Sequence, residues 1–174
     1  MLKRLENGTT LSCDTSALIV LAKLDLLTLF ADYASLKIHP LVAEEFGEEL
    51  PIRGDFVAAS EAGKTGGVEQ NAERQKETTR LLAALSPTDR EVVATALADK
   101  GGVLADDKRI LRTAEELDLI VLDSLSAALA LLFRGIIDER RYQACEEILA
   151  THYRYEPRLL RRAHVLRTFH EKMA

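Results

Sequence analysis

The chain has little of what disulfide-bonded, zinc-binding or membrane-spanning proteins need. It has two cysteines, Cys13 and Cys145, and neither lies in a CxxC motif or beside a histidine. We therefore expect buried free thiols rather than a disulfide or a zinc site. The longest apolar runs, 17–22 and 127–133, are far shorter than a membrane span, and the first residues lack the apolar core of a signal peptide. These absences predict a cytoplasmic protein that does not insert into a membrane.

Proline and glycine are also few, with four and nine residues scattered along the chain, and there is no low-complexity segment or solenoid repeat. A chain of 174 residues with 47% hydrophobic content can bury the core of one domain. We expect this domain to cover residues 1–150, followed by a basic helical extension over 151–174.

The net charge of -5 argues against a protein that holds nucleic acid by bulk electrostatics. An acidic body that works on phosphates would need bound cations. The extension has the opposite charge, because it contains six basic residues and only two acidic ones. It could contact phosphates or form an ordinary solvated helix, and its helical character favours a homodimer. The basic residues are Arg154, Arg158, Arg161, Arg162, Arg167 and Lys172.

Short apolar strands alternate with helical segments along most of the chain. The strands expected are 9–14, 36–39, 102–105 and 120–123. The helices expected are 16–33 with a bend near Leu24 and Asp25, 40–46 with Gly47 as a C-cap, 86–100 with Ser86 as N-cap and Gly101 and Gly102 at its end, 108–119, 125–133, 138–151 and 157–172. Residues 51–85 have no strand pattern and are expected to form a helical hairpin from 55–61 and 68–85. This alternation predicts an α/β fold with a parallel sheet covered on both faces.

Six acidic residues fall where such a fold would gather them. Three of them lie at the ends of expected strands, one lies in the first turn of an expected helix, and two lie one turn into another helix. Because ligands bind beyond the carboxyl ends of parallel strands, all six could share one rim. The six are Asp14, Glu44, Glu45, Asp89, Asp106 and Asp107.

Clustered carboxylates repel one another and show raised pKa values unless a divalent cation compensates them. Oxygen ligands without histidine or cysteine favour Mg²⁺ or Mn²⁺. Such a site suits phosphodiester hydrolysis, because a bound metal lowers the pKa of water and stabilises the leaving oxygen. Lys23, Arg109 and Arg112 lie near the expected rim and could contact phosphates.

Each acid also has an ordinary structural explanation. Asp89 completes a capping box with Ser86, and Asp14 could simply cap the helix after it. Glu44 and Glu45 are adjacent on a helix, so at most one faces the site, and the sequence leaves open which. The prediction therefore depends on the coincidence of all the places. His39, a lone histidine at a strand end, is expected to be structural.

Four segments resemble the PIN-domain family in order and spacing, and together they span most of residues 10–123. They are LSCDTSALIVLAK (11–23), HPLVAEEF (39–46), LSPTDREVVATALA (85–98) and GGVLADDKRILRTAEELDL (101–119). The resemblance implies a three-layer α/β/α fold with a short parallel sheet, a helical insertion at about 51–85 and a helical C-terminal extension. It also implies a Mg²⁺ or Mn²⁺ site and RNA as substrate. Many relatives are toxins of toxin-antitoxin pairs, which implies an antitoxin protein as a possible partner.

Carried over by position, the resemblance implies a set of catalytic acids. We take Asp14, Glu44, Asp89 and Asp107 as this set, with Glu45 and Asp106 as further candidate metal ligands. Thr15 or Ser16 would hold a metal-bound water, and both join the three basic rim residues as candidate RNA contacts. The chain departs from the family at Ala105, where relatives often have a hydroxyl residue, in its longer 51–85 segment and in its basic C-terminal helices.

Parts of the chain also fit three other interpretations. The segment VLADDKRILRTAEEL resembles the start of a phosphorelay receiver, but too little chain follows it for the remaining strands. The start SCDTSAL resembles a phosphatase with an aspartyl nucleophile, but position 16 is Ser where that chemistry wants a second acid. A catalytically silent PIN-like module that binds RNA or protein is the alternative that stays open.

Overall fold

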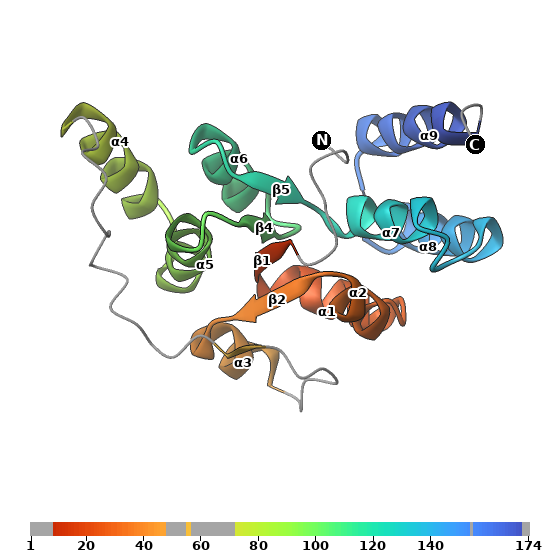
Figure 1. Ribbon diagram of the computed structural model, residues 1–174, viewed down its shortest axis with the longest axis horizontal. Coiled ribbons are helices and arrows are strands. Elements are labelled where there is room, and N and C mark those ends of the chain that lie inside the picture. The colour runs from red at the N-terminus through yellow and green to blue at the C-terminus, as the bar shows by residue number, and fades with distance from the viewer. Residues whose placement is uncertain (1–8, 48–54, 57–71, 154, 172–174) are drawn as a thin grey trace.

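The computed structural model describes residues 9–47, 55–56, 72–153 and 155–171, which form an α/β fold on a parallel sheet (Figure 1). The strands are β1 (Thr10–Cys13), β2 (Ser35–Ile38), β3 (Asp55–Phe56), β4 (Gly102–Leu104) and β5 (Ile120–Leu122). They lie in the order β3-β2-β1-β4-β5, and every neighbouring pair is parallel. The chain therefore leaves β1 towards one edge and later returns to its other side. The crevice beyond the carboxyl ends of β1 and β4 is where such a sheet usually binds ligands.

Helices cover both faces of the sheet, as the alternation predicted (Figure 1). On one face lie α4 (Ala72–Ala83), α5 (Pro87–Ala98) and α6 (Lys108–Glu116), with α5 packed on β1 and β4 and α6 on β4 and β5. On the other lie α1 (Thr15–Lys23), α2 (Leu27–Tyr33) and α7 (Ser124–Phe133), with α8 (Glu139–Thr151) and α9 (Pro157–Glu171) packed against α7. The short α3 (Pro40–Phe46) follows β2 and contacts α1.

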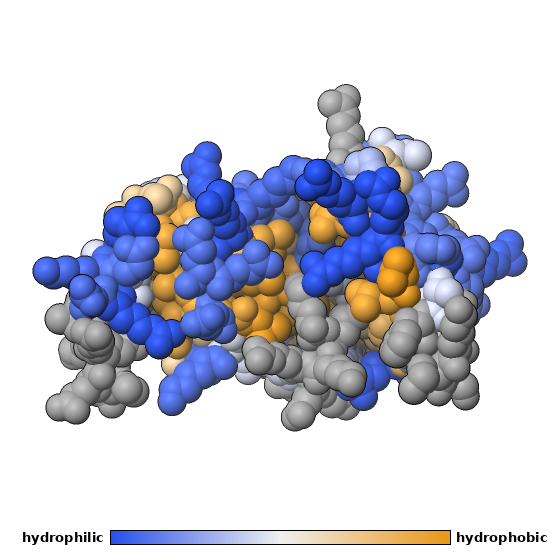
Figure 2. Space-filling view, turned by 90° about the horizontal axis from the view of Figure 1, so that it is seen from above, coloured by the Kyte–Doolittle hydropathy of each residue, from blue (hydrophilic) through white to orange (hydrophobic). Residues whose placement is uncertain are grey.

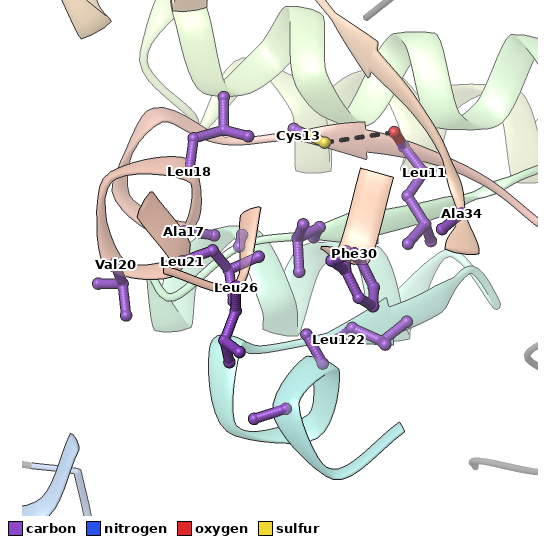
Figure 3. Close-up of a cluster of buried hydrophobic side chains, with 14 of the residues drawn as sticks. Leu11, Cys13, Ala17, Leu18, Val20, Leu21, Leu26, Phe30, Ala34 and Leu122 are labelled. Carbon is purple, nitrogen blue, oxygen red and sulfur yellow. Dashed lines mark hydrogen bonds between the residues drawn. The ribbon is translucent and has the colours of Figure 1, made fainter. Parts of the chain in front are cut away.

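The core lies between the sheet and the helices on both of its faces, and Figure 3 shows part of it. Leu11 from β1, Leu18 from α1 and Phe30 from α2 are fully buried there. Cys13 points into the same cluster, and its Sγ donates to the carbonyl of Leu11 at 3.5 Å. Burial raises the pKa of both the Cys13 and the Cys145 thiols, so both stay protonated. The prediction of buried free thiols is confirmed.

The two glycines expected to end a helix have a different use. Helix α5 already ends at Ala98, and Lys100 takes the left-handed conformation with φ 51°. A Cβ on Gly101 would lie 2.5 Å from the carbonyl oxygen of Thr10, and one on Gly102 would lie 2.7 Å from that of Ile120. Glycine is therefore needed here because β4 approaches its two neighbours closely.

The 51–85 segment was expected to contain only helices, and this was wrong near its start. Residues 55 and 56 form β3, which pairs with Lys37 and Ile38 of β2. A strand of two residues has no alternation to read, and it forms because β2 offers a free edge. The second expected helix is present as α4, which ends at Ala83 and not at residue 85, while residues 68–71 lie outside the described residues. Residues 57–61, part of the first expected helix, lie outside the described residues.

On the face seen in Figure 2, hydrophilic side chains alternate with apolar areas. A groove of about 260 Å³ runs between α6, β5, α7 and α9. No helix among the described residues is long and apolar enough to cross a membrane.

Candidate functional site

Asp14 lies at the carboxyl end of β1 and is the most deeply placed of the predicted acids. Its main-chain nitrogen donates to the carbonyl of Leu104 at 2.9 Å, and only 6% of the residue is exposed. It caps α1, because Oδ2 accepts from the nitrogen of Ser16 at 3.2 Å and also from the Ser16 hydroxyl. Burial raises the pKa of Asp14 against these bonds, and the charge of Asp89 raises it further. A buried carboxylate with a second carboxylate nearby is unfavourable unless a positive charge compensates it.

Asp89 lies in the first turn of α5, one residue after Thr88. Its nitrogen donates to Oγ of Ser86 at 3.2 Å, so the capping role expected for Ser86 is present. The side chain is half-buried, and its charge acts on Asp14. Capping is carried by Ser86 and not by the Asp89 carboxylate, which leaves that carboxylate available to a ligand.

Glu45 connects the helices that carry these two acids. Its Oε2 accepts from Oγ1 of Thr15 at 2.8 Å, and its Oε1 accepts from Oγ1 of Thr88 at 2.7 Å. Thr15 directly follows Asp14, and Thr88 directly precedes Asp89. Glu44 is exposed on the same helix, and neighbouring helical residues point about 100° apart. Of the two glutamates, Glu45 is therefore the one that faces Asp14 and Asp89.

Asp106 and Asp107 contact different parts of the structure. Asp107 is exposed and caps α6, with Oδ1 accepting from the nitrogens of Arg109 at 2.7 Å and Ile110 at 3.3 Å. Asp106 turns towards the start of α7, where its two oxygens accept from the nitrogen and hydroxyl of Ser124 at 2.9 and 2.7 Å. The main chain of Asp106 donates to Oγ of Ser16 at 3.4 Å. Ser16 thus joins Asp106 to Asp14.

Two residues of this region were missed at the sequence level, Asp123 and Tyr155. Asp123 ends β5 and caps α7, with Oδ1 accepting from the nitrogen of Ser126 at 2.7 Å. Burial raises its pKa, and the charge of Asp106 adds to the effect. Its position after a strand is the same signal that identified Asp14. The hydroxyl of Tyr155 donates to Asp106, and no sequence pattern indicates this contact across 49 residues.

The candidate RNA contacts are spread widely. Thr15 and Ser16 lie at the site, bonded to Glu45 and Asp14. Lys23 lies in the last turn of α1, at the opposite end of that helix from Asp14. Arg109 is exposed in the first turn of α6, and Arg112 pairs with Glu116 at 3.0 Å.

The basic C-terminal residues differ in exposure. Arg158, Arg161 and Arg162 are exposed on α9. Arg167 is only 14% exposed in its side chain and forms ion pairs with Glu139 at 3.0 Å and Glu146 at 3.6 Å. It therefore fixes α9 to α8. Arg154 and Lys172 lie outside the described residues.

His39 has a structural position, as expected for a lone histidine at a strand end. Its Nδ1 accepts from the nitrogen of Leu41 at 3.3 Å and so caps α3. Its Nε2 lies 3.7 Å from a carboxylate oxygen of Glu91.

The donor set of the site suits a hard divalent cation in its chemistry. Asp14, Asp89 and Glu45 offer carboxylate oxygens only, and the pKa of Asp14 is raised mainly by burial and further by the charge of Asp89. Within the described ranges, no three acidic, histidine or cysteine side chains converge closely enough to form a ready metal cage. Cation binding at this site would therefore draw the carboxylates together.

A comparison of the sequence with protein-family models finds one match that covers nearly the whole chain. The model describes a PIN domain and matches residues 11–171. PIN domains are in general nucleases and typically depend on a divalent metal. No curated protein and no solved structure matches the chain.

Proposed function

Because the chain belongs to the PIN-domain family, we propose that it is a divalent-metal-dependent endoribonuclease that hydrolyses phosphodiester bonds of RNA. The observation that carries this proposal is the buried carboxylate of Asp14 at the end of β1, with the charge of Asp89 beside it. A carboxylate is costly to bury without a compensating charge, and this one lies where parallel sheets bind ligands.

Asp14, Asp89 and Glu45 would hold Mg²⁺ or Mn²⁺. The ion supplies the positive charge that offsets the carboxylates, lowers the pKa of water and stabilises the leaving oxygen. The chain's own residues position the donors. Ser16 holds Oδ2 of Asp14, while Thr15 and Thr88 hold the two oxygens of Glu45.

The remaining predicted ligands have weaker support. Asp106 borders the site through Ser16, but its carboxylate serves Ser124 and Tyr155. Asp107 caps α6, and Glu44 lies on another side of α3 from Glu45. We propose that these three residues act at most as outer acids that attract cations to the rim.

The experiment compares cleavage of a labelled single-stranded RNA by wild type, Asp14→Asn and Asp99→Asn in Mn²⁺. Asp99 is an exposed acid at the opposite end of α5 from Asp89, so its variant is a matched control. We expect cleavage by wild type and Asp99→Asn and only background cleavage by Asp14→Asn. Equal cleavage by all three would contradict the assignment. RNA binding without cleavage by the wild type would favour a silent binding module.

The proposal extends to a toxin role and to partners. Expression of the wild type would then arrest growth, Asp14→Asn would not, and a co-expressed antitoxin would relieve the arrest. A homodimer is supported by the apolar side chains that α8 and α9 expose, with Val165 64% and Ile148 37% exposed. Light scattering measures the molar mass of the protein in solution and so distinguishes a homodimer from a monomer.

A further inference from the structure

A cavity of about 380 Å³ opens beside the acidic site, on the side of α1 that faces α9. We call it the tyrosine pocket and define it by Ser16 and Ile19 of α1, Asp106, Asp123, Tyr153 and Tyr155. It is large enough for one nucleobase and its sugar.

The tyrosine pocket is connected to Asp14 through a single side chain, that of Ser16. Ser16 lines the pocket, and its hydroxyl donates to the Asp14 carboxylate. The same Ser16 oxygen accepts from the main chain of Asp106, which lines the pocket from the opposite direction. A nucleotide whose phosphate lies at Asp14 and Asp89 can therefore place an adjacent base in this cavity.

The walls of the pocket combine aromatic rings, hydrogen-bond acceptors and the ion pair of Lys108 with Glu156. Tyr153 and Tyr155 come from the turn between α8 and α9, and aromatic rings of this kind stack on unpaired RNA bases. Asp106 is already engaged by Ser124 and Tyr155. Asp123 accepts from the main chain and the side chain of Ser126, and the further lone pairs of its two oxygens can accept donors from a ligand in the pocket.

The chemistry of these walls selects among the four bases. A carboxylate accepts from N–H groups and repels carbonyl oxygens. Guanine offers two parallel donors on one edge, its ring N1–H and its exocyclic amine. Uracil offers one N–H between two carbonyl oxygens, so it is the poorest match. On the basis of the proposed ribonuclease function, we infer that the tyrosine pocket binds a guanine base of the RNA substrate next to the scissile phosphate, with Asp123 accepting from its Watson–Crick edge.

The test measures binding of nucleosides, which carry no phosphate, so the acidic rim does not repel them. Guanosine, inosine and uridine are titrated against metal-free wild type in EDTA by ligand-detected NMR. We expect guanosine to bind about tenfold more tightly than uridine. Inosine lacks the exocyclic amine, and we expect it to fall between the two. Binding without discrimination, or tighter binding of uridine, would overturn the inference.

The decisive variant is Asp123→Asn, because asparagine caps a helix as well as aspartate does. Its amide can donate to a uracil carbonyl, so we expect weaker guanosine binding and a guanosine preference below about threefold. Asp138→Asn is the matched control, because Asp138 caps α8 through Oδ1 and the nitrogen of Arg141 at the same 2.7 Å. It should bind like the wild type. An unchanged preference in Asp123→Asn would refute the role of its carboxylate.

A second pair of variants tests the stacking wall independently of the α7 cap. Tyr153→Phe keeps the ring and should bind guanosine normally, whereas Tyr153→Ala should bind about tenfold more weakly. Equal binding by both would contradict a stacked base. These assays need neither metal nor hydrolysis, so failure of the ribonuclease proposal and failure of the guanine pocket give different results. RNA cleavage without nucleoside discrimination would refute only the pocket.

Discussion

Thr88 donates a 2.7 Å hydrogen bond from Oγ1 to Oε1 of Glu45 and so ties the start of α5 to α3. Thr15 makes the matching bond to the other carboxylate oxygen at 2.8 Å. Because these threonines adjoin Asp14 and Asp89, Glu45 fixes how the two acid-bearing helix starts lie relative to each other. The glutamate is thus part of the frame of the site even before any ligand binds.

Glu45→Gln should lower the rate of RNA cleavage about tenfold or more, and Glu44→Gln should leave it within about twofold of wild type. A glutamine amide nitrogen can only donate to a threonine hydroxyl, so one of the two bonds has to reverse its direction, and the substitution also removes the negative charge that would hold the cation. Initial rates in saturating Mn²⁺ compare the two variants, and melting temperatures show that both remain folded. If Glu44→Gln were the damaged variant, the catalytic glutamate would be Glu44.

Much of this site was predictable because its main acids follow a positional rule. Asp14 and Asp106 end parallel strands, and the same rule applied to β5 would have found Asp123. The choice between Glu44 and Glu45 was not predictable, because it depends on where the threonines of two other helices lie. Tyr155 was hidden for a similar reason, since its contact with Asp106 depends on how α9 folds back on α7.

The fold was predictable to a similar degree. The alternation of apolar strands with capped helices gave the parallel sheet and its helical layers. The pair Gly101 and Gly102 resembles a helix stop in sequence, yet its cause is the close approach of β4 to Thr10 and Ile120. β3 could not be identified, because pairing with β2 decides its conformation and two residues carry no pattern of their own.

Arg167→Ala should destabilise the protein by about 1–3 kcal/mol, whereas Arg161→Ala should change stability by less than about 0.5 kcal/mol. Arg167 pairs with Glu139 and Glu146, and its guanidinium lies 5.8 Å from the centre of the Tyr142 ring. Arg161 is exposed on the same helix. Urea unfolding of both variants measures the difference. Equal stability would mean that α9 contributes little to the body of the domain.

Mn²⁺ should raise the melting temperature of the wild type, because a cation that binds only the folded state stabilises it by mass action. At a concentration roughly ten times Kd, the gain is about 1.4 kcal/mol, or about 3–5 °C for a chain of this size. Asp14→Asn should lose most of this shift and Asp99→Asn should keep it. A wild type that does not respond at millimolar Mn²⁺ would argue against a shared carboxylate site.

Without metal, Asp14→Asn should be more stable than the wild type at neutral pH, and the difference should vanish in acid. Burial raises the pKa of Asp14 in the folded protein above the ordinary aspartate value of 3.8. Between these two pKa values the folded state binds more protons than the unfolded state, so stability falls as pH rises through that window. Above the raised pKa, burial of the ionised Asp14 lowers the stability of the wild type by its full amount. Below pH 3.8 the carboxyl is protonated in both states and this loss of stability is absent.

Asparagine is the right replacement for this measurement, because it keeps the N-cap of α1 while removing the titrating charge. Urea unfolding of both proteins in EDTA, from pH 3 to pH 8, gives the two stability curves. The difference between the free energies of unfolding of the two proteins should grow as pH rises above about 3.8 and should stay constant above the raised pKa. A variant that is less stable at every pH would show that the Asp14 charge is already compensated within the folded chain, and the argument that this carboxylate calls for a cation would fail.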